Sequence, residues 1–240
     1  MVMTRVLFTV VLVIGLHSAA AAQSRLEMFR QNEHYVVLPV PTSTATAGQS
    51  HGGLLVQELF SYACIHCHRF EPVITAWAQQ LPEDVRFERV PAVFSRGWML
   101  LAKAYYVAEA CGVLDFTHDA MFSAIHEEGR RFEDATAIAR FYSDRIRGAE
   151  RVRGQTDTRC RSRDDFLDAF ESLEVAQAVQ QALASSRVWQ VGSVPTLVVA
   201  GRWRTDGRLA GSNPAMLEVA DHLLRRSRAE AETGDGDPDY

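Results

Sequence analysis

Two cysteines separated by two residues, Cys64-Ile65-His66-Cys67, limit the folding of this 240-residue chain more than any other feature. The apolar run at residues 54–60 predicts a buried strand, and the spacing of apolar residues after Cys64 predicts a helix. The two thiols therefore lie one helical turn apart, where a strand leads into a helix. Unpaired N–H groups and the helix dipole favour negative charge there, so we expect Cys64 to ionise readily as the nucleophile and Cys67 to be the resolving thiol.

His66 lies between the cysteines and can donate a hydrogen bond to the Cys64 thiolate or place a positive charge beside it. The same spacing of cysteines also occurs in zinc sites, haem-attachment sites and structural disulfides. A zinc site needs two further ligands at comparable spacing, but the other two cysteines are distant, so no metal is expected. Residues 64–68 also spell the Cys-x-x-Cys-His attachment motif of c-type haem, although the buried strand before them favours an α/β protein. A purely structural disulfide across so short a loop would add little stability.

The rest of the chain gives strand and helix patterns in an order typical of an α/β domain interrupted by helices. Strands are expected at residues 35–38, 85–93 and 196–200, and no strand is expected after Gly201. A final helix should end near Leu224. Between the second and third of these strands, helices are expected at residues 98–111, 115–127, 134–146, 163–170 and 174–188.

The amino terminus has the layout of a secretory signal: a positive charge at Arg5, an apolar run at residues 6–16, and a small-residue cleavage site at Ala20-Ala21-Ala22. The run is too short to span a bilayer, so we expect a cleaved signal at residues 1–22 and a periplasmic mature protein. Disulfides persist in such a compartment. The net charge of −5, with no aromatic residues among basic runs, indicates no nucleic-acid partner.

The segment Glu58-Leu59-Phe60-Ser61-Tyr62-Ala63-Cys64-Ile65-His66-Cys67 resembles the active-site segment of DsbA-type thiol oxidases of the thioredoxin superfamily. Val194-Pro195-Thr196 resembles the cis-proline loop of that family, and Pro72 matches its kink proline. The resemblance covers most of the mature chain and implies an α/β, thioredoxin-like fold with an inserted all-helical domain. The expected segments are residues 23–94 and 189–227 for the two parts of the thioredoxin-like domain, 95–188 for the helical insertion, and 228–240 for a disordered tail.

The same resemblance implies roles for residues outside the cysteine pair. A cis Val194-Pro195 bond would pack against the pair, and Val194 would offer backbone groups to a substrate peptide. Ile65, where these enzymes often carry proline, is assigned to the same substrate-binding surface. Glu58 is an acid in an otherwise apolar strand; it would lie beneath the pair, relay the proton of Cys67 and pair with Arg89. The alternative is that Glu58 and Arg89 lie at an edge of the sheet with both side chains exposed to solvent.

Two further groups of residues carry weaker expectations. In an exported protein, leftover cysteines more often pair than stay free, so a structural disulfide between Cys111 and Cys160 is favoured over a buried free Cys111 and an exposed Cys160. His118 and His126 lie two turns apart on a helix, so together with Glu127 they are expected to be solvated surface residues rather than metal ligands.

The sequence thus predicts a monomeric thiol:disulfide oxidase that donates the Cys64-Cys67 disulfide to folding exported proteins and uses no cofactor other than that disulfide. The resemblance implies reoxidation by a quinone-linked membrane enzyme of the DsbB type. Three alternatives stay open: a disulfide isomerase or reductase of the same fold, a c-type haem electron-transfer protein, and a redox-inert binding module.

Overall fold

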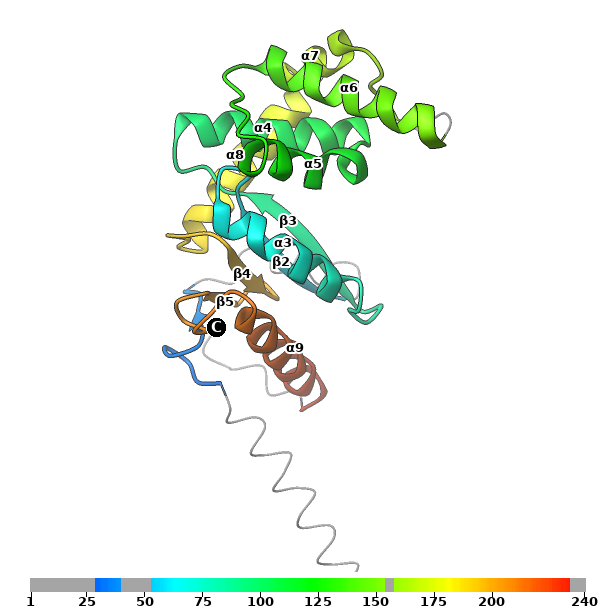
Figure 1. The fold of residues 1–240 in the computed structure, drawn as a ribbon. Coiled ribbons are helices and arrows are strands. Elements are labelled where there is room, and N and C mark those ends of the chain that lie inside the picture. Colours follow the sequence, from blue (N-terminus) through cyan, green and yellow to red (C-terminus); the bar gives the residue numbers. More distant parts are fainter. Residues whose placement is uncertain (1–28, 40–52, 154–157, 234–240) are drawn as a thin grey trace, which may run out of the picture.

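A computed structural model describes residues 29–39, 53–153 and 158–233. Five strands form one mixed sheet in the order β1-β5-β4-β2-β3 (Figure 1). The strands are Val36–Val37 (β1), Leu54–Phe60 (β2), Val85–Pro91 (β3), Thr196–Val199 (β4) and Trp203–Asp206 (β5). Strand β2 pairs with β3 in parallel and with β4 in antiparallel orientation, so it has a partner on both sides. The expected signal at residues 1–22 lies outside the described residues.

Seven helices accompany the sheet in the described part of the chain. Helix α3 follows β2, helices α4 to α8 lie between β3 and β4, and α9 follows β5. Their bounds are Ile65–Ala78 (α3), Arg96–Cys111 (α4), Leu114–His126 (α5), Ala135–Arg153 (α6), Arg163–Phe170 (α7), Leu173–Val188 (α8) and Ala215–Thr233 (α9). Helices α4 to α7 gather at one end of the molecule and α9 lies at the other (Figure 1). We call α4 to α7 the helical block.

Capping residues explain where several of these helices begin and end. The side chain of Ser95 accepts a hydrogen bond from the Trp98 N–H at the start of α4, and Gly112 ends that helix with φ 71°, a conformation that costs glycine little. Ser162 and Asp165 form a reciprocal capping box at the start of α7. These local patterns are why the sequence-based bounds of α7 match the structure.

The buried residues form three clusters around the sheet. Helices α3 and α9 pack together with strands β2, β4 and β5, for example through Ile74, Leu223 and Val199. A second cluster joins Leu59 and Val198 to Ala182 of α8. The third fills the helical block and includes Phe60, Tyr62 and Cys67. The end of β2 and the beginning of α3 therefore lie where the sheet meets the helical block.

Two sequence-based expectations about the last part of the chain are wrong. Strand β5 was not expected, because the charged residues Arg204 and Asp206 interrupt its apolar pattern. In the structure Trp203, Thr205 and Asp206 are all buried, and only Arg204 is partly exposed. The final helix continues to Thr233 rather than ending near Leu224, so residues 228–233 are helical and not part of a disordered tail. Ion pairs support this extension, with Arg226 bonded to Glu230 one turn further on. Residues 234–240 lie outside the described part.

Candidate functional site

The cysteine pair lies at the amino terminus of α3. Cys64 is the N-cap residue, its N–H donates to the carbonyl of Ser61, and the chain then turns directly from β2 into the helix. Cys64 is half-buried and Cys67 is fully buried; both are free thiols. Ile65, at 37% exposure, and His66 lie on the surface beside them. The structure thus exposes one sulfur and shields the other.

The two thiols have opposite electrostatic environments. The pKa of Cys64 falls to about 6, because the Cys67 thiol donates a hydrogen bond to its sulfur; backbone N–H groups of Cys67 and His66 and the charge of His66 act in the same direction, against the effect of burial. Burial raises the pKa of Cys67 far above its ordinary value, and its contacts with Cys64 and Glu58 add to this. At neutral pH, Cys64 is therefore an anion while Cys67 keeps its proton.

The expected proline loop lies against the exposed thiol. The Val194-Pro195 peptide bond is cis, Pro195 is buried, and strand β4 begins at the next residue. The Cys64 Sγ atom lies 3.5 Å from the carbonyl oxygen of Val194. Residues that are 130 positions apart in the sequence are thus brought together, because β4 pairs with β2.

Glu58 lies on an interior strand of the sheet and not at a solvent-exposed edge. It is fully buried in β2, and its cross-strand partners are Arg89 on β3 and Leu197 on β4. Its Oε2 atom lies 3.5 Å from Nε of Arg89, yet neither carboxylate oxygen has a hydrogen-bond partner among the described residues. Burial raises the pKa of Glu58, and the nearby charge of Glu71 raises it further, while Arg89 opposes both.

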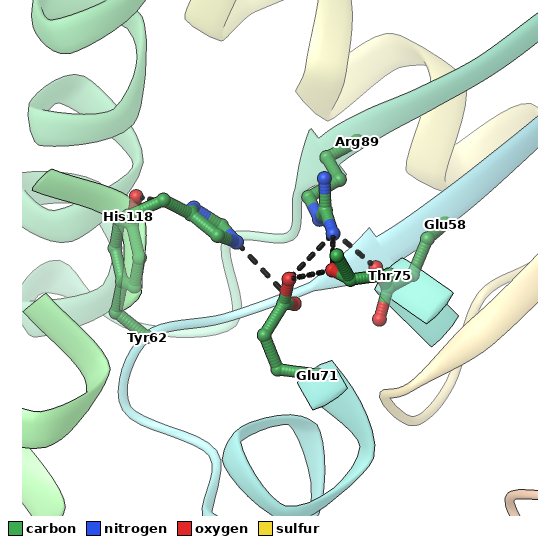
Figure 2. Close-up of polar contacts among 6 residues, drawn as sticks. All are labelled: Glu58, Tyr62, Glu71, Thr75, Arg89 and His118. Carbon is green, nitrogen blue, oxygen red and sulfur yellow. Dashed lines mark hydrogen bonds and ion pairs between the residues drawn. The ribbon is translucent and has the colours of Figure 1, made fainter. Parts of the chain in front are cut away.

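Arg89 makes its hydrogen bonds to a second acid, which the sequence analysis did not identify. Its Nη2 atom donates to Glu71 and to Thr75, both on α3, and the Thr75 hydroxyl donates to Glu71 at 2.7 Å (Figure 2). Burial alone would raise the pKa of Glu71, but the contacts with His118, Arg89 and Thr75 outweigh it and lower the pKa. The position four residues after Cys67 was the available indication, because it places Glu71 on the same face of the helix.

The expectation of solvated surface residues is wrong for His118, whereas His126 is partly exposed and Glu127 is exposed. His118 is buried; its Nδ1 atom lies 2.8 Å from the Tyr62 hydroxyl, and its Nε2 atom lies 3.3 Å from Glu71 (Figure 2). His126 donates from Nε2 to the Tyr62 carbonyl at 2.8 Å and stacks on His68. Their spacing of two turns lets both side chains of α5 reach the segment just before Cys64.

A disulfide joins Cys111, the last residue of α4, to Cys160 in the segment before α7. This is the pairing favoured from the sequence. The Arg159 N–H also donates to the Cys111 carbonyl at 3.0 Å, so the two segments are held by a covalent bond and a backbone hydrogen bond. Within the described residues, no group of three His, Cys, Asp or Glu side chains is arranged to hold a metal ion.

We expect Glu58→Gln to stabilise the protein at pH 8 and to change its stability little at pH 5. A carboxyl whose pKa is raised in the folded state binds a proton that the unfolded chain has released, so stability is lost as pH rises from 4.5 toward about 8. Glutamine stays neutral and removes that loss, which is on the order of 4 kcal/mol for a shift of this size. Urea unfolding at both pH values measures it.

Glu88→Gln is the matched control for this experiment, because Glu88 precedes Arg89 on β3 but is 44% exposed. It should show no gain that grows with pH. An equal gain from Glu58→Gln at pH 5 and pH 8 would contradict a raised pKa for Glu58.

Comparison with known proteins places this site in a family. No protein-family model matches the chain. The sequence is 34% identical over 216 residues to the thiol:disulfide interchange protein DsbA of Azotobacter vinelandii, which covers 90% of this chain and 91% of the relative. It is 31% identical over 229 residues to DsbA of Pseudomonas aeruginosa, which covers 95% of this chain and 99% of the relative.

Solved structures give the same result. The crystal structure of Pseudomonas aeruginosa DsbA matches with a TM-score of 0.69 and 32% identity, over 85% of this chain and 97% of that one. The oxidoreductase DsbA from Xylella fastidiosa matches with a TM-score of 0.68 and 31% identity, over 83% and 98% of the two chains. The α/β, thioredoxin-like fold with a helical insertion, expected from the sequence, is confirmed.

The fold, with its cysteine pair at a helix amino terminus, defines a thiol:disulfide oxidoreductase of the thioredoxin class. The relatives are more specific than the class, because they match at over 30% identity along nearly their whole length. The chain belongs to the DsbA family of thiol:disulfide interchange proteins. This membership favours the disulfide oxidase over the isomerase, reductase and haem alternatives.

Proposed function

We propose that the chain oxidises the thiols of exported proteins by donating a Cys64-Cys67 disulfide. A substrate thiolate attacks the Cys64 sulfur, the disulfide breaks, and Cys67 leaves as a thiolate that takes up a proton. A second substrate thiolate then attacks the substrate sulfur of this mixed disulfide and expels the Cys64 thiolate. The substrate loses two electrons and gains a disulfide, while the cysteine pair gains the two electrons.

The observation that carries this proposal is the opposite ionisation of the two sulfurs. Because the pKa of Cys64 falls to about 6, its thiolate is a stable leaving group at neutral pH, and the reduced pair is favoured over the disulfide. A disulfide whose reduced form is stabilised in this way is a strong oxidant. The half-exposed Cys64 is also the sulfur that a substrate can reach, whereas Cys67 is fully buried.

Glu58 is proposed to supply the proton that Cys67 needs when it leaves. The raised pKa keeps a proton on this carboxyl near neutral pH. When Glu58 is ionised, its negative charge is one of the causes that raise the pKa of Cys67. A buried acid of this kind can pass its proton to a forming thiolate and recover it afterwards. Arg89, at 3.5 Å, stabilises the carboxylate while the proton is away.

The substrate is proposed to bind loosely beside the Val194-Pro195 loop. The Val194 backbone faces the Cys64 sulfur, and a proline next to it offers no N–H of its own, so an extended peptide could bond to the Val194 backbone. Ile65, the exposed apolar residue next to Cys64, adds a surface that accepts many sequences. His66 lies exposed beside the thiolate and contributes its charge.

The cellular setting is also part of the proposal. The family membership and the signal-like residues 1–22 support a periplasmic enzyme, which we propose to act as a monomer. None of the described helices is long and apolar enough to cross a membrane. The reduced pair must lose its two electrons before the next turnover, which we assign to a quinone-linked membrane oxidase of the DsbB type. No cofactor other than the cysteine pair takes part in these steps.

The equilibrium of the cysteine pair with glutathione tests this function. We expect a reduction potential well above thioredoxin's value of about −270 mV and toward the DsbA reference value of about −120 mV. The same protein should oxidise a reduced, unfolded test protein in stoichiometric amounts. A potential near that of thioredoxin would instead assign the chain to the reductases.

A further inference from the structure

The charged groups beneath the cysteine pair extend further than the proposed relay requires. Glu58 and Arg89 suffice for that relay, yet Arg89 donates its Nη2 hydrogen bonds to α3, and Glu71 lies 3.3 Å from Nε2 of His118 (Figure 2). We call Glu58, Arg89, Glu71 and His118 the acid cluster. Its side chains come from β2, β3, α3 and α5, so it links the sheet to the helical block.

A charge count shows that the acid cluster needs one proton. With both carboxylates ionised and His118 neutral, two negative charges face the single positive charge of Arg89, and the surplus negative charge is costly where water is scarce. One proton neutralises the cluster, and either Glu58 or His118 can hold it. Both oxygens of Glu58 and the Nε2 atom of His118 lack a hydrogen-bond partner within the described residues, so no hydrogen bond already fixes where the proton sits.

The two proton sites differ in their access to water. Glu58 is fully buried, whereas His118 and Glu71 line a cavity of about 310 Å³. The lining also includes Asp115 and Asp119 of α5. The ionisable groups that face His118 are Glu71 from α3, Arg89 from β3, Tyr105 from α4, Tyr62 from the segment before Cys64, and Asp115 and Asp119 from its own helix. A proton can therefore enter the cluster at His118 more easily than at Glu58.

We propose that His118 is the second proton site of the acid cluster and replaces the proton that Glu58 gives to Cys67. The inference rests on the proposed function. Glu58 first gives its proton to the Cys67 thiolate; a proton from solvent then enters at His118 and passes through Glu71 to Glu58, so one proton is taken up for each one given and no electrons move. The Tyr62 hydroxyl, 2.8 Å from Nδ1, holds the ring with Nε2 toward Glu71. His118 acts through Glu58 and is a positioning residue.

The test compares His118→Gln with His118→Lys in the reduced, full-length protein. The readout is the pH at which the infrared band of the protonated Glu58 carboxyl disappears; Glu58→Gln identifies that band by removing it. Lysine fixes a positive charge next to Glu71, so the midpoint should fall, whereas glutamine cannot hold the proton, so the midpoint should be higher. We expect the two midpoints to differ by at least about one pH unit, a tenfold change in proton affinity, with the natural protein between them.

His126→Gln and His126→Lys are the matched controls. His126 lies on the same helix, but it contacts the backbone of Tyr62 and stacks on His68 rather than approaching Glu71. Its two variants should differ by much less than the His118 pair. Coinciding midpoints for His118→Gln and His118→Lys, or a separation no larger than that of the His126 pair, would overturn the inference.

A measurement on the unaltered protein covers the case in which His118→Lys does not fold. Two groups that share one proton titrate in two steps over the same pH range. The ring resonances of His118 and the Glu58 band should therefore both show two steps; a single, independent step for each group overturns the proposal. These titrations do not depend on substrate oxidation. A failed glutathione experiment thus removes the proposed function while the titrations still decide whether the proton is shared.

Discussion

Cys64→Ser is expected to lower the rate of oxidation of a reduced test protein by at least about 1000-fold, to the uncatalysed background. A serine hydroxyl cannot form a disulfide, and it is not ionised at neutral pH, so the variant has neither the oxidising bond nor the leaving group. Cys67 cannot substitute for it, because Cys67 is fully buried and its pKa is raised. The rate of disulfide formation in a reduced, unfolded protein measures the effect.

Cys67→Ser provides the comparison that assigns the nucleophile. This variant also lacks the disulfide, but it retains the half-exposed Cys64. We expect it to react with an alkylating agent at pH 7 at least about 100-fold faster than Cys64→Ser does, because only the thiolate is nucleophilic. Undiminished turnover by Cys64→Ser, or equal alkylation of the two variants, would reject Cys64 as the attacking sulfur.

Removing the structural disulfide should have the largest effect on stability. The bond joins residues 49 positions apart, and for a loop of that size the chain-entropy relation gives a loss of about 4 kcal/mol in the free energy of unfolding. The double variant Cys111→Ala, Cys160→Ala tests this value by urea unfolding. Because neither Cys111 nor Cys160 is among the groups that shift the pKa of Cys64 or Cys67, the reduction potential of the pair should not change.

The unaltered protein in its reduced form is the control for that experiment. Mild reduction that opens only the Cys64-Cys67 bond should leave the contribution of the Cys111–Cys160 bond in place. A loss of less than about 1 kcal/mol in the double variant would show that the bond does not restrain the unfolded chain. A changed potential in the double variant would show that the helical block and the cysteine pair are coupled through this bond.

Local patterns in the sequence predicted the reactive segment and most elements correctly. The two-residue spacing of Cys64 and Cys67 depends only on neighbours in the chain, so strand, turn and helix could be predicted around it. The same holds for α7, whose boundary is set by the capping pair Ser162 and Asp165. Strand β5 was missed because it exists through pairing with β4 and β1, a contact that its own four residues do not indicate.

Only two of the four residues of the acid cluster could be predicted, because the other two depend on contacts between distant elements. Glu58 was identifiable as an acid among apolar residues in one strand, and Arg89 as its partner in the next. Glu71 and His118 look like ordinary polar residues of two amphipathic helices, and they become buried only when α3 packs against α5. Tyr62 likewise forms hydrogen bonds with two histidines, His118 and His126, that lie more than fifty positions away in the sequence. Single-sequence patterns carry no information about such contacts.

The position of β4 in the chain has a consequence for biosynthesis. Cys64 and Cys67 are synthesised before the helical block, whereas Val194 and Pro195 follow it. A nascent polypeptide that has been synthesised only as far as α8 has both thiols but lacks the strand that pairs with β2. Until β4 is added, the Cys64 sulfur lacks the Val194 carbonyl beside it, so the site is completed only after the helical block and α8 have been synthesised.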